Sequence, residues 1–117
     1  MKKLFFLLPL VAILLLAFRN SNDPLPIGSA LPAPENKMKD ISGKEVSFKD
    51  VMKNNGLLVM FSCNTCPVVG KYQSRTLEIG KYAASKGIGV IVLNSNEGTR
   101  SEGESFEDMQ TYGKEQG

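Results

Sequence analysis

The chain has 117 residues, 42% of them hydrophobic, with 14 basic and 12 acidic side chains and no histidine, a length that suits one domain. The lack of histidine excludes histidine general bases, Cys–His nucleophile pairs and mixed Cys/His metal sites within the chain. Because Lys2, Lys3 and Arg19 all precede residue 20, residues 20–117 carry 11 basic against 12 acidic groups and no basic run, which argues against nucleic acid as the partner.

The first twenty residues have the pattern of a targeting segment. Lys2 and Lys3 precede an uncharged apolar run over residues 4–18, which is typical of a secretory signal. The run is shorter than the roughly 17–25 residues of a membrane span, yet no small-x-small cleavage site follows it. A cleaved signal peptide and a membrane anchor over residues 1–20 therefore both stay open, ahead of a domain over residues 21–117. A signal peptide and an anchor both predict export. The domain would lie in the periplasm, or it would be anchored to a membrane through residues 4–18 and face the periplasm or the outside of the cell.

Three features precede the first long strand. Four of the six prolines lie in residues 20–34, which predicts an extended segment. Residues 39–48 place an aspartate, serine and glycine turn before a period-two stretch with Val46 and Phe48 on one face, which predicts a small hairpin. Two asparagines and a glycine at residues 54–56 then break the chain before that strand.

Residues 57–61 give the clearest strand signal. They are five consecutive apolar residues between a glycine and a serine, which predicts a strand buried on both faces. Both cysteines of the chain, Cys63 and Cys66, follow at once, and Pro67 comes next, where its ring suits the first turn of a helix. The stretch therefore predicts a strand, a Cys-x-x-Cys motif and a helix.

The cysteine spacing suits dithiol chemistry. Residues three apart at a helix start have Cβ atoms roughly 5–6 Å apart, which is close to the separation that a disulfide requires. The free N–H groups and the positive end of the helix dipole would favour a thiolate on the first cysteine. We therefore expect Cys63 to be the more acidic and more exposed thiol and the attacking one, with Cys66 as the resolving thiol.

A long helix is expected after Pro67, ending at a lysine and a glycine at residues 86–87. Apolar spacing at steps of three and four predicts its buried face, made of Val69, Tyr72, Thr76, Ile79 and Ala83. Tyr72 and Tyr82 are expected in the core and at its margin. Residues 88–93 then form a second apolar run, so that strand, helix and strand make a βαβ unit with parallel strands and a right-handed crossover.

The polar loop over residues 94–97 leaves the same sheet edge as the cysteines, because the carboxyl ends of parallel strands face one way. Its side chains either line the site or form a solvated loop. The last short helix is expected to bury one face that includes Phe106, Met109 and either Tyr112 or Gly113.

These residues together resemble the thioredoxin-fold redoxins, and more narrowly the peroxiredoxin-like branch of the alkyl hydroperoxide reductase and thiol-specific antioxidant superfamily. The resemblance extends over residues 26–117, and residues 61–69, 72–75, 90–97 and 104–109 carry it. It implies an α/β, thioredoxin-like fold around the central βαβ unit and a redox-active dithiol at Cys63 and Cys66. Family members continue with two more strands, a helix and a cis-proline loop, so the resemblance implies a chain truncated before that half.

The chain departs from the peroxiredoxin pattern Pro-x-x-x-Thr/Ser-x-x-Cys. Met60 and Gly56 stand three and seven residues before Cys63, so the hydroxyl that would hold a peroxide is missing there. Without the later strands, the strand over residues 57–61 would also keep an unpaired edge, which promotes association. We therefore expect a marginally stable chain that tends to associate.

Dithiol–disulfide exchange outside the cytoplasm is the leading functional interpretation. The expected partners are protein or small-molecule disulfides and thiols, and no cofactor is expected. The alternatives are a peroxiredoxin-like antioxidant, a copper(I) or soft-metal carrier using Cys63 and Cys66, a zinc site completed by a second copy and a merely structural disulfide.

Overall fold

The computed structural model describes residues 24–116, so the expected signal peptide or anchor over residues 1–20 lies outside the described part. The chain divides into two compact units between Leu31 and Pro32. Residues 24–30, in the first unit, are exposed and include a turn in which the Ser29 N–H donates to the Pro26 carbonyl. Within residues 24–116, no helix combines the length and the apolar character that crossing a membrane requires.

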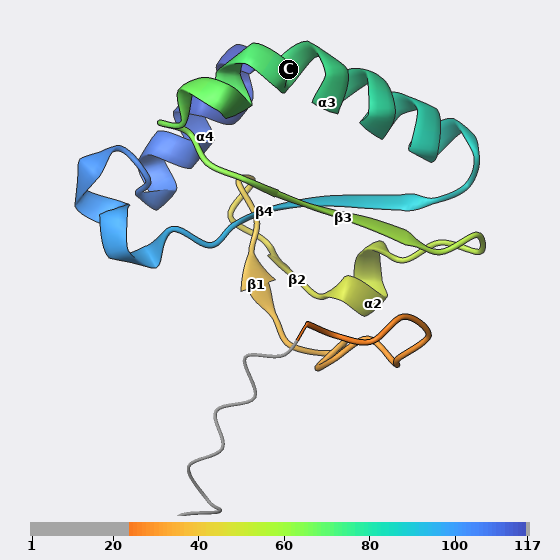
Figure 1. Cartoon of the computed structure of the whole chain (residues 1–117). Coiled ribbons are helices and arrows are strands. Elements are labelled where there is room, and N and C mark those ends of the chain that lie inside the picture. Colours follow the sequence, from red (N-terminus) through yellow and green to blue (C-terminus); the bar gives the residue numbers. More distant parts are fainter. Residues whose placement is uncertain (1–23, 117) are drawn as a thin grey trace, which may run out of the picture. The chain divides into compact units, whose positions relative to one another are not determined.

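The second unit is built on a βαβ element, as the sequence predicts. Strands β3 (Leu57–Ser62) and β4 (Gly89–Asn94) pair in parallel with Leu57 opposite Gly89, and helix α3 (Pro67–Ser85) connects them. Figure 1 shows α3 along one face of the two strands and α2 (Phe48–Val51) on the other. The described residues therefore form a mixed α/β fold with two small sheets.

Helix α3 begins and ends where its sequence predicts. Pro67 occupies the first turn, where its missing N–H costs no hydrogen bond. At the other end, Gly87 has a φ of 70°, its N–H donates to Ala84 and the Ile88 N–H donates to Ala83. These two bonds form a Schellman motif, which satisfies the last carbonyls and sends the chain back into β4.

The predicted buried face of α3 is confirmed in part. Ala83 is buried, and Val69 and Thr76 are partly buried. Tyr72, Ile79 and Tyr82 are 52%, 52% and 65% exposed, so their assignment to the core or its margin is wrong. Gly80 also lies on the inward side, where an added Cβ would lie 3.8 Å from a Val90 side-chain carbon. Small residues let the helix approach the sheet closely, which turns the tyrosines toward solvent.

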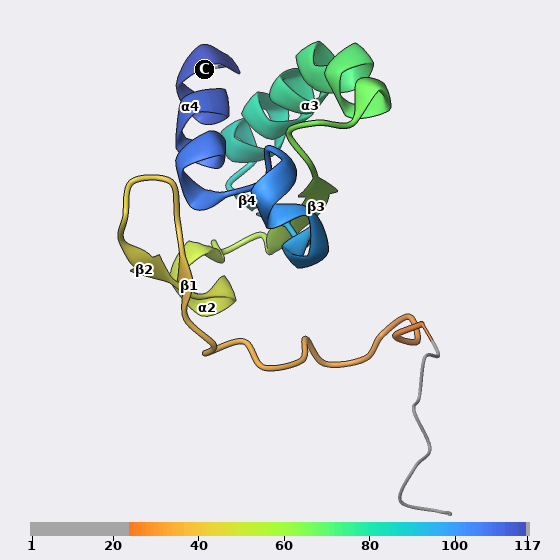
Figure 2. The same cartoon turned by 90° about the vertical axis from the view of Figure 1, so that its left-hand side faces the viewer.

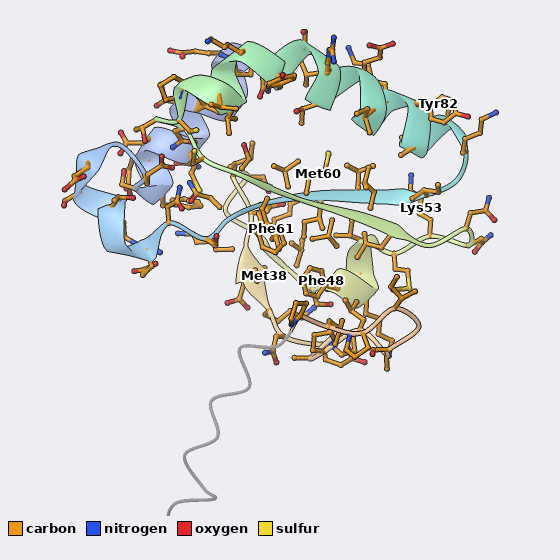
Figure 3. All side chains as sticks on the ribbon, viewed as in Figure 1. Met38, Phe48, Lys53, Met60, Phe61 and Tyr82 are labelled. Atoms are coloured by element: carbon orange, nitrogen blue, oxygen red, sulfur yellow. The ribbon has the colours of Figure 1, made fainter. Side chains whose placement is uncertain are left out.

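The prediction that the strand over residues 57–61 is buried on both faces is wrong, because residues 57–60 are only partly buried and the strand is most exposed at its end. Met60 lies on the α3 side of the sheet, and Phe61 lies on the opposite side (Figure 3), as alternation along a strand requires. Phe61 is 72% exposed. On β4, Val92 is also exposed. Among the described residues β3 pairs only with β4, so little covers this end of the second face.

The predicted hairpin forms and then stops early. Strands β1 (Met38–Lys39) and β2 (Glu45–Val46) pair antiparallel as a separate sheet. Phe48 does not continue the strand, because Ser47 and Asp50 form a capping box that starts α2 at that residue.

A 3-10 helix, η1 (Glu97–Glu102), and helix α4 (Phe106–Gln116) follow β4. The predicted inner face of α4 is confirmed, because Phe106, Met109, Tyr112 and Gly113 are all partly buried. Figure 2 shows α4 beside α3 and above the β1–β2 hairpin. The Tyr112 hydroxyl lies 3.2 Å from the Gln73 side-chain oxygen, to which it donates.

Gly89 gives a test of this packing. A Cβ at residue 89 would overlap the carbonyl oxygen of Val51 and lie 3.2 Å from a Leu57 methyl carbon. We expect Gly89→Ala to lower the free energy of unfolding by about 2–3 kcal/mol, because backbone cannot yield as a side chain can. Urea unfolding measures this effect. Gly70→Ala is the control, since a Cβ there would meet no atom within 4 Å apart from its chain neighbours and the backbone of its own helix, and it should stabilise α3 by up to about 1 kcal/mol. Equal midpoints for both variants would contradict the expected overlap.

Candidate functional site

The two predicted cysteines lie at the junction between β3 and α3. Cys63 directly follows the last residue of β3, and Cys66 is the N-cap residue of α3. Both are partly exposed free thiols. The motif therefore stands at the carboxyl end of a parallel strand, where ligands and substrates of open α/β sheets bind.

A buried carboxylate organises the turn between the cysteines. Glu104, just before α4, is 3% exposed. One of its oxygens accepts from the Thr65 N–H at 2.9 Å and from the Thr65 hydroxyl at 2.7 Å. The other accepts from the Asn64 N–H at 2.9 Å and from the Asn94 amide at 2.6 Å. Four donors therefore converge on one carboxylate, and two of them are the backbone N–H groups between the cysteines.

These donors keep Glu104 ionised although it is buried. Burial raises the pKa of this carboxyl, but the Asn64 N–H, the Thr65 hydroxyl and N–H, and the Asn94 amide outweigh it and hold the pKa at about 2. Hydrogen bonds to a charged acceptor are stronger than those between neutral groups. The carboxylate is therefore a fixed negative charge beneath the turn at any pH above about 4.

Gly103 also contacts the turn between the cysteines. The Asn64 side-chain amide donates to the Gly103 carbonyl at 3.0 Å. Gly103 has a φ of 98°, and a Cβ there would lie 2.8 Å from the Thr65 methyl carbon. Glycine is thus needed both for the left-handed backbone and for the close approach of the two segments.

The surroundings shift the pKa values of the two thiols in opposite directions. Burial raises the pKa of Cys63 and the neighbouring Cys66 thiol raises it further, whereas the Cys66 backbone N–H lowers it. The N–H groups of Val69 and Val68 lower the pKa of Cys66, although its side chain makes no cap hydrogen bond. These directions run against the expectation that Cys63 is the more acidic thiol, and that expectation stays a prediction. Both thiols are partly exposed, so the expected difference in exposure is not evident.

The two interpretations of the loop over residues 94–97 each hold for part of it, because Ser95 and Glu97 are exposed whereas Asn94 reaches the turn between the cysteines. Asn94 belongs to the site, since it donates to Glu104, and its own side-chain oxygen accepts from the Asn96 N–H at 3.0 Å. The sequence pattern assigns Glu104 no role of its own. Its only signals were its place in the segment that carries the family resemblance and its position just before an apolar helix face.

Within residues 24–116, no group of three or more Cys, Asp or Glu side chains is arranged to hold a metal ion. Glu104 is an acid whose charge acts on both thiols, and both of its oxygens already accept two hydrogen bonds each. The arrangement can offer two thiolates to a partner.

No protein-family model and no curated protein matches the chain. Among solved structures, the chain is similar to an uncharacterized conserved protein from Geobacillus kaustophilus, with a TM-score of 0.70 and 28% sequence identity. The match covers 80% of this chain and 49% of that one. The chain thus spans about half the length of this structural neighbour, whose title names no activity.

Proposed function

We propose that the chain is a thiol–disulfide oxidoreductase that acts through Cys63 and Cys66. The observation that carries this proposal is the clamp of Glu104 on Asn64 and Thr65, which fixes the turn between two partly exposed thiols. A fixed turn keeps the thiols at one separation, so the disulfide can close and reopen with little backbone movement. A merely structural disulfide would not require such a clamp.

In this reaction one thiolate attacks a substrate disulfide and forms a mixed disulfide, releasing one substrate thiolate. The second cysteine then attacks the sulfur of the first and releases the other substrate thiolate. The Cys63–Cys66 disulfide forms, and the substrate gains two electrons. The reverse sequence oxidises a substrate dithiol, and an external thiol or disulfide pool resets the protein.

The proposed fold is thioredoxin-like, and the proposed place of action is outside the cytoplasm. The order β3, Cys-x-x-Cys, α3, β4 supports the thioredoxin-like fold. The apolar run over residues 4–18 supports action outside the cytoplasm. Protein or small-molecule disulfides and thiols are the proposed partners.

Reduction of insulin disulfides by dithiothreitol tests the function. The 117-residue chain should accelerate the reaction, and the double variant Cys63→Ser with Cys66→Ser should return it to the uncatalysed rate. Equal rates with the chain and with the double variant would contradict the proposal.

Peroxide chemistry is expected to be slow. The hydroxyl between the cysteines, that of Thr65, donates to Glu104 at 2.7 Å and is therefore not free to hold a peroxide. We expect the reduced chain to consume hydrogen peroxide at the rate of an ordinary thiol, as measured by loss of free thiol over time. Turnover many times faster than that of free cysteine at the same pH would favour the peroxiredoxin-like alternative instead.

A further inference from the structure

Helix α3 carries an apolar stripe on a flank that the rest of the described chain leaves largely uncovered. Four large apolar side chains form it, and each is more than half exposed: Val68, Tyr72, Ile79 and Tyr82. Figure 3 shows Tyr82 on the side of α3 that faces away from the strands. With Arg75, the four residues recur at steps of four and three, which is the spacing of the contact face of a two-stranded coiled coil.

The stripe also carries a pair of opposite charges. Arg75 lies within it, Glu78 borders it, and both side chains are exposed. Among the described residues neither one takes part in an ion pair, and the Arg75 guanidinium lies over the Tyr72 ring instead, 5.6 Å from its centre. The stripe therefore presents a cation and an anion to whatever covers it.

A shallow hollow of about 480 Å³ lies on the same flank. Four residues of the helix line it, namely Arg75, Glu78, Ile79 and Tyr82. Their positions are i, i+3, i+4 and i+7, which is the set that forms the hole for an inserted side chain when two helices pack as a coiled coil. The shape of the stripe thus fits a second helix lying along it.

We propose that this stripe is a homodimer interface, in which the α3 helices of two copies of the chain pack antiparallel. Tyr72 of one copy lies opposite Tyr82 of the other. At a rise of about 1.5 Å per residue, the same register brings Arg75 opposite Ile79 and within one residue of Glu78. Arg75 of each copy therefore enters the hollow of the other, where its guanidinium meets the Glu78 carboxylate.

A second copy is the occupant that this surface fits, because the stripe is complementary to itself. A two-fold axis repeats every contact, so one register gives two tyrosine pairs and two pairs of opposite charge. The contact is small, since each 19-residue helix is about 28 Å long and a standard interface buries roughly 1,600 Å². We therefore expect a reversible dimer with a dissociation constant in the micromolar range.

Charge reversal tests the Arg75–Glu78 pair by sedimentation velocity over a series of concentrations, with a phosphine reductant to prevent disulfides between chains. Arg75→Glu and Glu78→Arg should each weaken dimerisation roughly tenfold, because each variant brings like charges together twice in a dimer. The double variant restores opposite charges and should return to within about threefold of the unsubstituted chain.

Lys81→Glu is the matched control for charge reversal. It changes the net charge by the same amount as Arg75→Glu, but Lys81 lies on another flank of α3, where it lines a hollow together with residues of α4. Dimerisation of this variant should be unchanged. An unsubstituted chain that stays monomeric at millimolar concentration, or a double variant that dimerises no better than the single ones, would overturn the proposal.

Disulfide cross-linking tests the register in chains that lack both native thiols, through Cys63→Ser and Cys66→Ser. One such chain carries Tyr72→Cys and another carries Tyr82→Cys. Oxidation should link the two chains when they are mixed and should not link either chain to itself, because like positions lie about 15 Å apart along the antiparallel helices. Linkage of each chain to itself, or none in the mixture, would contradict this register and point to another surface, such as the free edge of β3.

The dimer and the proposed function fail separately. Sedimentation and cross-linking report association whether or not the chain exchanges disulfides, and insulin reduction reports exchange whether or not the chain dimerises. Far-UV circular dichroism of each variant checks that the fold is kept. All variants contain the same residues 1–23, so association through that segment would be equal in all of them and would not follow the charge-reversal pattern.

Discussion

Glu104→Ala is expected to lower the free energy of unfolding by about 3 kcal/mol or more, the largest effect of any single substitution at the site. Its carboxylate accepts four hydrogen bonds at 3% exposure, and its removal leaves partly buried donors from Asn64, Thr65 and Asn94 without this acceptor. Unsatisfied buried donors cost about 1–3 kcal/mol each. Urea unfolding at pH 7 measures the loss, and Glu102→Ala, at an exposed neighbour, should change stability little. A loss below about 1 kcal/mol would contradict the clamp.

The carboxylate of Glu104 makes the free energy of unfolding fall as the pH is lowered. Its pKa is about 2 in the folded chain and about 4.3 in an unfolded one. The unfolded state therefore takes up the proton first as the pH falls, so the contribution of Glu104 is complete above about pH 5 and is lost between about pH 4.5 and 2. Urea unfolding at pH 7, 4.5 and 3 should show this loss.

Comparison with Glu104→Gln isolates this contribution. Hydrogen bonds from Ser42 and Lys37 also lower the pKa values of Asp40 and Asp50, respectively. These two aspartates therefore make the free energy of unfolding fall with decreasing pH in the unsubstituted chain and in the glutamine variant alike. The glutamine variant should be less stable at pH 7 and lose less stability on acidification. Parallel pH curves for the two proteins would contradict an ionised, hydrogen-bonded Glu104.

The second large effect is expected from the cysteine variants. Replacing either cysteine should abolish insulin reduction, because no intramolecular disulfide can form. In Cys66→Ser the expected attacking thiolate of Cys63 remains and its resolving partner is lost, so mixed disulfides with a substrate should accumulate. Non-reducing electrophoresis after incubation with oxidised insulin measures them, and Cys63→Ser should trap much less. Greater trapping by Cys63→Ser would reverse the order that the sequence predicts.

The sequence predicts the βαβ unit well because its signals are local. The apolar run before the cysteines, Pro67 at the helix start and Gly87 at its end each act on the backbone within a few residues. They define β3, α3 and β4 without knowledge of the rest of the fold. Cys63 and Cys66 fall at the predicted junction for the same reason.

The features that the sequence did not predict depend on contacts between segments that are distant in the chain. Apolar spacing predicted Ala83 on the buried face of α3, but it also placed Tyr72 there, which is 52% exposed, and it gave no sign that Gly80 packs against Val90. Glu104 lies about 40 residues from the turn it holds, and no periodicity links the two.

The most direct test of the oxidoreductase proposal is the redox equilibrium of the dithiol with glutathione. The 117-residue chain is incubated at a series of reduced-to-oxidised glutathione ratios, quenched with acid, alkylated and analysed by mass. We expect one reversible two-electron transition between the dithiol and a Cys63–Cys66 disulfide, with a reduction potential between about −270 and −120 mV. A chain that forms only glutathione adducts, with no intramolecular disulfide at any ratio, would contradict it.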